Sequence, residues 1–306
     1  MRQPGRTLWW ALALTVGTAA FVARLVPVLR SGGLLGVNHY DAAVYFGSAV
    51  GLVHGEVPYR DVLMLHPPGI VLALVPFGAL ALLIGDTSAM AVGRLAWMVL
   101  GALSAVLVAR LLRPLGLLPA AVGGLFYAVF HPAVTIEQTT RLEAVGAVCL
   151  AGALVLLSVP QPRVALRPRA VLLAGALLGF AATVKIWGVV PLLVVALYLL
   201  AAAGWAHAAR FTIGAGAVGV VVCLPFLLAA PDRMWRYVVV DQIDRAPSRA
   251  PTLSRLADLT GLGLVEGRLE GWAPAVVGAA VAVYAVAALL AVRVPQARLS
   301  VVLLVA

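Results

Sequence analysis

The sequence predicts an all-α fold, a polytopic bundle of membrane helices, from three observations. Hydrophobic residues make up 63% of the 306 positions and charged residues only 11%, whereas soluble domains have about 45–50% apolar and about 25% charged residues. The apolar residues form long segments of the length that a helix needs to cross a bilayer. The net charge of +10 is scattered between these segments. We therefore exclude an ordinary soluble protein, and we expect a lipid bilayer and no nucleic acid as the partner of the basic residues.

Apolar segments follow one another along the whole chain. The first follows Arg2 and Arg6 and resembles a signal peptide, but it is long enough to span a bilayer and more segments follow, so we predict an uncleaved helix. The segments lie at 8–29, 67–84, 88–109, 115–130, 142–159, 170–184, 186–203, 211–230 and 272–292. A last apolar run starts near Leu299 and ends at Ala306, so we expect a single domain over residues 1–306, of about 8–9 spans, that lacks C-terminal spans.

The basic residues indicate which loops face the cytoplasm, since cytoplasmic loops are enriched in Lys and Arg. If every segment crossed the membrane from a cytoplasmic N-terminus, the basic loops 110–114 and 161–169 would lie outside. If the segment 67–84 instead dips into the outer leaflet and returns, these loops become cytoplasmic and all 12 acidic residues lie outside. We therefore predict a multi-pass plasma-membrane protein with a cytoplasmic N-terminus and two large outer loops, at 30–87 and 231–271.

The first outer loop carries the most informative residues. In a helix predicted over residues 39–54, with Asn38 as its N-cap, Asp41, Tyr45 and Ser48 share one face. The other faces are largely apolar, which is typical of a helix that lies at a membrane surface. A carboxylate in this setting is costly without a task or a partner. Asp41 is therefore either a cap that favours the positive end of the helix dipole or a general base.

Two cationic candidates follow in the same loop. Arg60 and His66 are residue types that bind phosphate, Arg through a bidentate pair of donors and His through one donor. The alternative for Arg60 is an ion pair with Asp61 or Glu56. The alternative for His66 is simply a position at the end of a loop.

Three short motifs follow the first helix in order. They are Tyr-Asp-Ala-Ala-Val-Tyr at 40–45, Gly-Glu-Val-Pro-Tyr-Arg-Asp at 55–61 and His-Pro-Pro-Gly at 66–69, which leads a short apolar helix. This order resembles the GT-C superfamily of integral-membrane glycosyltransferases, which use polyprenyl-phosphate sugars. It is similar to the protein mannosyltransferase and aminoarabinose transferase branch, and to the polyprenyl-phosphate-mannose-dependent mannosyltransferases of actinobacterial cell envelopes. The resemblance is good over roughly residues 1–190.

The resemblance implies a fold and a set of functional positions. In the GT-C fold the first outer loop holds two juxtamembrane helices, and the second of them does not cross the membrane. Asp41 falls where the superfamily has its catalytic acidic residue. His66 stands where several members have a Lys that contacts the lipid phosphate, and Arg141 and Glu143 stand where they have an Arg-x-Asp pair. The implied donor is a polyprenyl-phosphate sugar.

Two further places carry polar groups between apolar segments. Residues 131–143 are predicted as an outer loop in which Glu143 orients sugar or acceptor hydroxyls and Arg141 meets the phosphate; the alternative is an interfacial ion pair that anchors a helix end. Lys185 is the only lysine and lies at the outer boundary of two spans. It is either a snorkelling anchor beside Trp187 or a cation for the donor phosphate.

The second large outer loop contains an aromatic and charged stretch, residues 235–245. Gln242 and Arg245 are our candidates there for binding the sugar or the acceptor, together with Tyr45 in the first loop; the alternative is a solvated interfacial helix. The two cysteines, Cys149 and Cys223, lie in apolar segments, which argues against a disulfide framework or a zinc site. Since the sequence shows no strong ligand cluster, we assign no cofactor; a divalent metal stays open, because the GT-C superfamily includes metal-dependent members.

These residues and the resemblance lead to one predicted function. We expect a glycosyltransferase that moves mannose or arabinose from a polyprenyl phosphate to a glycolipid, polysaccharide or protein acceptor outside the membrane, with inversion and with Asp41 as general base. Arg60, His66, Arg141 and Lys185 would stabilise the departing phosphate. The alternatives are a transporter or lipid flippase without chemistry, and a catalytically inactive membrane scaffold.

Overall fold

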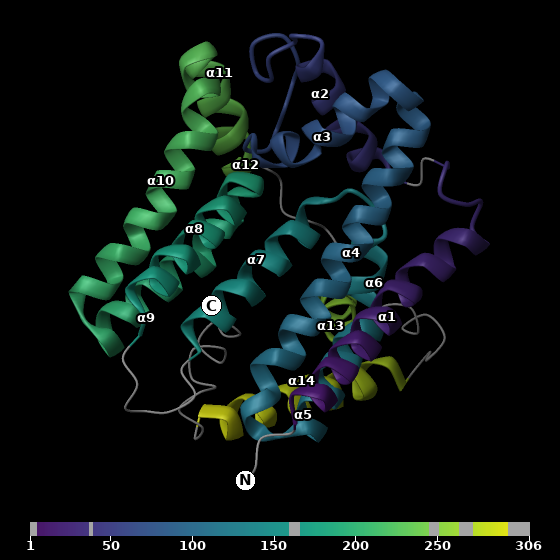
Figure 1. Cartoon of the computed structure of the whole chain (residues 1–306), viewed down its shortest axis with the longest axis vertical. Helices are drawn as coiled ribbons and strands as arrows, with labels where there is room; N and C mark the ends of the chain where they lie inside the picture. Colours follow the sequence, from purple (N-terminus) through teal and green to yellow (C-terminus); the bar gives the residue numbers. More distant parts are fainter. Residues whose placement is uncertain (1–4, 37–38, 159–165, 245–250, 263–271, 293–306) are drawn as a thin grey trace.

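Helices dominate the computed structural model, which describes residues 5–36, 39–158, 166–244, 251–262 and 272–292. Within these ranges no β-strand occurs, and the one isolated bridge pairs Pro58 with Val62. The predicted all-α membrane bundle is therefore confirmed (Figure 1). The helices are α1 (Arg6–Arg30), α2 (Tyr40–Val53), α3 (Gly69–Ile84), α4 (Asp86–Leu112), α5 (Leu117–Val129), α6 (His131–Glu137), α7 (Leu142–Leu157), α8 (Pro168–Val184), α9 (Val189–Ala203), α10 (Trp205–Ala229), α11 (Pro231–Trp235), α12 (Asp241–Ile243), α13 (Thr252–Thr260) and α14 (Ala273–Val292). Short 3-10 turns lie at Arg113–Leu115 (η1) and Ile186–Gly188 (η2), and a π-helical turn joins α11 to α12 at Arg236–Val240 (η3).

Each of the nine apolar segments from 8–29 to 272–292 coincides with a helix, but the helices differ in length. The last apolar run, from Leu299, lies outside the described residues. Four are long and apolar enough to cross a membrane, namely Arg6–Arg30, Asp86–Leu115, Ile186–Ala203 and Trp205–Ala229. The pair of α5 and α6 is a fifth candidate, bent by 55° at Phe130. Four further apolar helices, α2, α3, α7 and α8, are 14–17 residues long. The expected number of about 8–9 spans is reached only if shorter helices also cross, since a full crossing takes about 20 residues.

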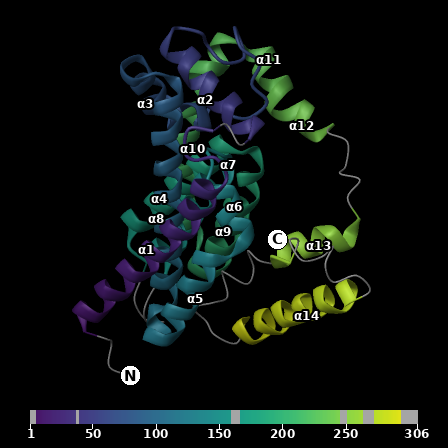
Figure 2. The same cartoon turned by 90° about the vertical axis from the view of Figure 1, so that its right-hand side faces the viewer.

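α1 and α4 pack side by side in opposite directions. Near the start of α1, the Trp9 ring lies 5.9 Å from the Arg110 guanidinium and 4.8 Å from that of Arg113, at the end of α4. At the other end, Arg94 in the third turn of α4 reaches the carbonyl groups of residues 33–36, which follow α1. The chain from α1 to α4 therefore leaves and re-enters the bundle at the same end. α2 and α3 lie at that end, called here the α2–α3 end (Figures 1 and 2).

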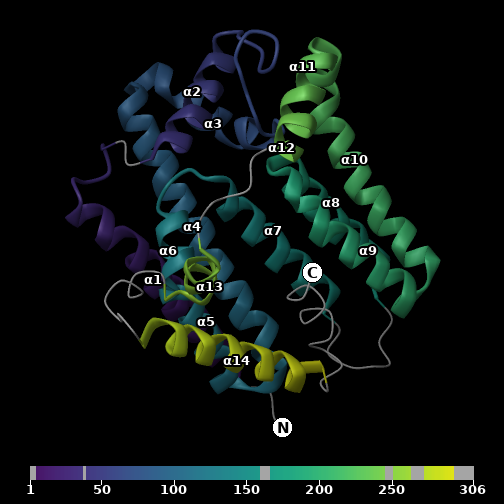
Figure 3. The ribbon, with the colours of Figure 1, turned by 180° about the vertical axis from the view of Figure 1, so that it is seen from behind.

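The second half of the bundle is built from α7, α8, α9 and α10, seen from behind in Figure 3. α7 and α8 are antiparallel, since Glu143 at the start of α7 meets Lys185 just after α8. α8 and α10 are parallel and very close: a Cβ added at Gly175 or Gly179 would collide with the backbone of α10. Small residues allow this approach, which is how membrane helices gain van der Waals contact where water no longer drives association.

A buried cluster under the α2–α3 end joins the two halves of the bundle. It contains side chains from α2, α3, α4, α7, α8 and α10 to η3, among them Tyr45, Ile70, Trp97, Leu142, Val184 and Phe226. Side chains on the outer faces of the same helices, such as Leu82, Leu103 and Val221, are exposed. In a protein that spans a membrane such faces meet lipid, so their exposure needs no further partner. The cluster therefore packs beneath the loops and helices of the α2–α3 end and holds them in place.

Candidate functional site

α2 places Asp41 at the open surface of the α2–α3 end. The helix begins at Tyr40 with His39 as its N-cap, one residue later than predicted, and Asn38 lies outside the described residues. The Asp41 side chain is 45% exposed, and its Oδ2 lies 3.8 Å from Nδ1 of His39. One turn later, Tyr45 is buried in the cluster below. Asp41 is thus an accessible carboxylate in the first turn of a helix that is anchored by Tyr45 one turn later.

His66 lies against α2, and hydrogen bonds hold its main chain and that of Leu65. Its ring meets the Tyr45 ring edge-on, with centroids 5.7 Å apart. Tyr59 donates its hydroxyl to the His66 carbonyl at 2.6 Å, and the Gln242 amide donates to the Leu65 carbonyl at 2.9 Å. Both donors are buried. The predicted acceptor-binding residue Gln242 is therefore engaged with the main chain that positions His66.

Tyr59 adopts a backbone conformation that favours glycine, with φ of +70°. Its amide donates to the Val62 carbonyl at 2.8 Å, which closes a tight turn over residues 59–62. Its ring packs edge-on against Phe226 at the end of α10, with centroids 6.3 Å apart. Burial raises the pKa of the Tyr59 phenol, so the hydroxyl remains a donor. A strained residue thus ties the loop between α2 and α3 to the second half of the bundle.

Glu143, Lys185 and Arg141 meet at the junction of α7 and α8. Lys185 Nζ donates to Glu143 Oε1 at 3.0 Å, and Arg141 Nε lies 3.8 Å from Glu143 Oε2. The exposed fraction of the side chain is 33% for Glu143, 37% for Lys185 and 26% for Arg141. Two cations therefore flank one carboxylate at a half-buried position, which leaves net positive charge at the rim of the bundle. The structure brings these sequence candidates together.

Arg60 pairs with its neighbour Asp61. Its guanidinium donates to the Asp61 carboxylate at 2.8–3.1 Å, with both groups exposed. Arg60, followed by the amide of Val57, holds the pKa of the Asp61 carboxyl below its usual range. This is the ion pair that the sequence offered as the alternative to phosphate binding.

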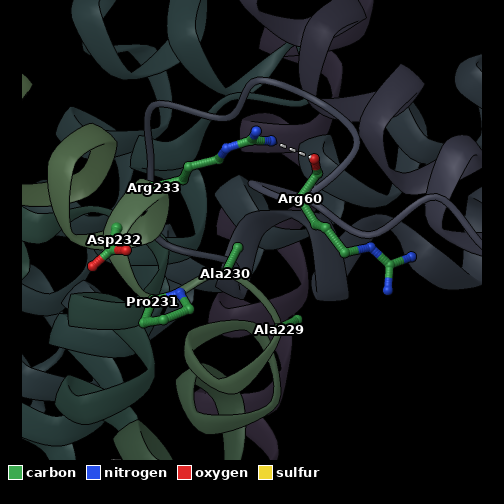
Figure 4. A pocket seen from close by; sticks show the side chains of 6 residues that line it. All are labelled: Arg60, Ala229, Ala230, Pro231, Asp232 and Arg233. Atoms are coloured by element: carbon green, nitrogen blue, oxygen red, sulfur yellow. Dashed lines mark hydrogen bonds between the residues drawn. The ribbon is translucent and has the colours of Figure 1, made fainter.

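An open cavity of about 320 Å³ lies between Arg60 and the end of α10 (Figure 4). Arg233 on α11 crosses its rim and donates to the Arg60 carbonyl at 2.7 Å. The Arg60 guanidinium points away from that of Arg233, so the two cations do not converge on one ligand. The cavity is lined by Arg60, Ala229, Ala230, Pro231, Asp232 and Arg233.

An apolar groove of about 400 Å³ lies between α8, α9 and α10. At one end it reaches Pro67, the residue after His66, and the pair Thr183 and Ile186, which flanks Lys185. Small side chains form much of its wall on α10 and α8. The lining residues are Pro67, Gly179, Ala182, Thr183, Ile186, Leu192, Thr212, Ala215, Gly216, Gly219, Cys223, Met234 and Val238.

A buried polar network that the sequence did not predict lies inside the bundle. Residues 131–137, expected in an outer loop, form α6, and Glu137 turns inward to an ion pair with Arg24 of α1. Tyr127 donates its hydroxyl to Glu137 Oε1 at 2.7 Å. A charge within an apolar helix needs a partner, so Arg24 in the first predicted span was the signal that such a carboxylate exists.

The remaining candidates are placed as follows. Arg245 lies outside the described residues. Within the described ranges no group of three or more His, Cys, Asp or Glu side chains is arranged to hold a metal ion, and Cys149 and Cys223 are free thiols. The candidates that the structure does bring to the α2–α3 end are Asp41, Tyr45, Arg60, His66, Arg141, Glu143, Lys185 and Gln242.

Comparison with known families decides the class of protein. The family model of glycosyltransferase family 87 matches residues 65–306, which is most of the chain. The chain belongs to glycosyltransferase family 87. This membership confirms the expected glycosyltransferase and is consistent with a membrane enzyme of the GT-C type. It favours the enzyme over the transporter and scaffold alternatives. No curated protein and no solved structure matches the chain.

The family match covers only part of the candidate site. Arg141, Glu143 and Lys185 fall within the matched range, as does His66 at its start. Asp41 and α2 precede it. The catalytic assignment of Asp41 therefore depends on its position in the structure and on the motif order, and the family match does not bear on it.

Proposed function

We propose that this family 87 glycosyltransferase takes mannose or arabinose from a polyprenyl-phosphate donor and transfers it to an acceptor hydroxyl at the outer face of the membrane. One observation supports this donor above all: at one end the apolar groove is lined by Pro67, the residue after His66, and by Ile186, the residue after Lys185. A polyprenyl phosphate has the same order of parts, a long apolar chain that ends in an anion.

The groove suits the chain of the donor. Glycine and alanine side chains on α8 and α10 leave space along it, and its lining is almost entirely apolar. An isoprenoid chain in this groove would replace lipid contacts without exposing apolar surface to water. The phosphate would then lie near Pro67 and Thr183, at the α2–α3 end.

The cations at the end of the groove suit the phosphate. As the sugar leaves, negative charge builds on the phosphate oxygens, and preorganised donors stabilise that charge best. Lys185 and Arg141 are already held around Glu143, and His66 is fixed through its main chain. Arg60 contributes to the phosphate only if it exchanges Asp61 for the donor.

Asp41 is the proposed general base of an inverting transfer. The acceptor oxygen bonds to the anomeric carbon as its proton passes to the Asp41 carboxylate, and the bond from that carbon to the phosphate oxygen breaks with its electrons. An exposed carboxylate is open to an acceptor that arrives from water. Tyr45, Glu143, Gln242 and Arg245 are proposed to orient the sugar and the acceptor, which is a glycolipid, a polysaccharide or a protein.

The proposed orientation puts the α2–α3 end outside the plasma membrane. From Arg6 to Asp244, the described part of the opposite end carries arginines and no acidic residue; these arginines are Arg6, Arg110, Arg113, Arg167, Arg169 and Arg210. Under the positive-inside rule that end is cytoplasmic. The chain also returns to the same end between α1 and α4, which supports a segment 67–84 that does not cross.

Transfer in vesicles tests the proposal. Purified protein would be reconstituted with polyprenyl-phosphate mannose, polyprenyl-phosphate arabinose or a nucleotide sugar, and the products identified by mass spectrometry. We expect transfer from a lipid-linked donor and none from the nucleotide sugar. Asp41→Asn should abolish it, whereas Asp86→Asn, which alters another exposed carboxylate at the same end, should not. Near-normal turnover by folded Asp41→Asn protein would show that Asp41 is not the base.

A further inference from the structure

Arg94 is a buried cation that binds only main-chain carbonyl groups among its described partners. It lies on α4 and is 1% exposed. Its Nη1 donates to the carbonyls of Leu34 at 2.7 Å and Gly36 at 2.8 Å, and its Nε donates to the carbonyl of Gln138 at 3.4 Å. Within the described part of the chain no carboxylate forms an ion pair with it. Burying a guanidinium without a carboxylate partner costs free energy of folding, which suggests that Arg94 has a function at this position.

The carbonyls belong to the two chain segments that lead into the candidate site. Gly36 precedes α2, which carries Asp41 in its first turn. Gln138 precedes α7, whose N-cap is Arg141 and whose first turn holds Glu143. Arg94 therefore joins the segment that positions the proposed base to the segment that positions the residues proposed for the phosphate and sugar.

Trp97 extends this arrangement by one turn of α4. Its indole Nε1 donates to the Arg141 carbonyl at 2.7 Å. Arg94 and Trp97 are three residues apart and so share a helix face, and together they hold both ends of the segment from Gln138 to Arg141. Trp97 acts on that segment alone, while Arg94 also acts on the segment before α2.

The geometry requires arginine in particular. The acceptors lie around the fork of the guanidinium, so that Nε faces one segment and Nη1 the other. A lysine has a single nitrogen at the end of a flexible chain and cannot present fixed donors in two directions. Because the acceptors are carbonyls, the link does not depend on the side chains of either segment.

We propose that Arg94 is a positioning residue for sugar transfer, which fixes Asp41 relative to Arg141 and Glu143. This inference rests on the proposed function. Without Arg94, the segment before α2 loses its hydrogen-bonded link to the segment before α7, while the buried cluster, the groove, Lys185 and the Trp97 bond to Arg141 remain. Donor binding then persists, but the base is displaced from the anomeric carbon. A displacement of about 1 Å costs on the order of 100-fold in rate.

The test is steady-state kinetics of Arg94→Met and Arg94→Lys in the reconstituted full chain, with a distance measurement beside it. We expect kcat to fall roughly 10- to 100-fold in both variants, with the donor KM changed by less than about threefold. The matched control is Arg110→Met, the same change on the same helix at the opposite end, which should keep wild-type kcat. A loss of stability alone would lower the folded fraction and leave kcat per folded molecule unchanged. The activities are therefore expressed per folded molecule.

The distance is measured by spin labels on α2 and beyond α8. Tyr40 and Trp187 are both exposed and would be replaced by cysteine in a background without Cys149 and Cys223. We expect a broader distance distribution in Arg94→Met than in Arg110→Met. An unchanged width, or unchanged kcat with folded protein, would overturn the proposal. If the wild-type chain transferred no sugar, the proposed function would fail, and the label distances would still decide whether Arg94 fixes α2.

Discussion

Arg24 and Glu137, 113 residues apart in the sequence, form a buried ion pair between α1 and α6. The Arg24 Nε donates to Glu137 Oε2 at 2.8 Å, and its Nη1 donates to the carbonyls of Ala20 and Ala128. Tyr127 satisfies the other carboxylate oxygen. The pair therefore closes the bend between α5 and α6 onto α1, and it sets the direction in which the chain continues to Arg141.

Breaking this pair should destabilise the bundle strongly. Glu137→Ala leaves the Arg24 charge buried without its partner, which costs about 3–5 kcal/mol. The double variant Arg24→Met/Glu137→Leu removes both charges and should recover much of that loss. Thermal unfolding in detergent measures both effects. A double variant that is less stable than Glu137→Ala would show that the pair itself, and not the isolated charge, supplies the stability.

Gly101 should be equally sensitive, because it gives the pair its space. A Cβ added there would collide with Arg24 Nε and Glu137 Oε2. Gly101→Ala should therefore lower the unfolding temperature, although alanine is the better helix former by about 1 kcal/mol. Gly146→Ala on α7 is the matched control, since its Cβ would meet nothing within 4 Å. Equal unfolding temperatures for the two variants would contradict the packing described.

Substitution of Lys185 distinguishes its two possible roles, binding of the donor phosphate and anchoring of a helix end. If it binds the donor phosphate, Lys185→Met should raise the donor KM roughly tenfold or more, since a hydrogen bond to a charged group contributes about 1.5–3 kcal/mol. Lys185→Arg should keep most of the affinity, because it keeps the charge. An unchanged KM in Lys185→Met, measured over a range of donor contents in vesicles, would leave Lys185 as an anchor that pairs with Glu143.

Filling the apolar groove should block the donor chain. Gly219 lines the groove, and a Cβ there would meet nothing within 4 Å, so a Gly219→Leu side chain starts in open space at the groove. We expect a higher donor KM and an unfolding temperature no lower than that of the wild type. Gly146→Leu, outside the groove, should alter neither. A wild-type KM for Gly219→Leu would exclude this groove as the donor site.

The sequence predicted the helices well because their cause is local. Each apolar segment contains enough residues to satisfy its own backbone hydrogen bonds in lipid, so a helix follows whatever its neighbours are. The helix from Tyr40 to Val53 was also predicted, because Asp41, Tyr45 and Ser48 repeat at helical spacing.

Contacts between segments that lie far apart in the chain could not be predicted from the sequence. Nothing in the pattern around Glu137 distinguishes an outer loop from a helix that turns its carboxylate toward Arg24. The positive φ of Tyr59 and the use of Gln242 to hold the Leu65 carbonyl likewise depend on residues more than a hundred positions away or on one tight turn. Candidate residues could be named from the sequence, but their neighbours could not.

The groove between α8 and α10 has a consequence for how the enzyme meets its substrate. Its flanks carry exposed apolar side chains such as Leu193 and Val220, so a lipid-linked donor would enter sideways from the bilayer. The encounter is then two-dimensional. The rate would depend on the mole fraction of donor among the surrounding lipids and not on its amount per volume of solution. Dilution of the vesicles with inert lipid would therefore lower the rate, whereas dilution with buffer would not.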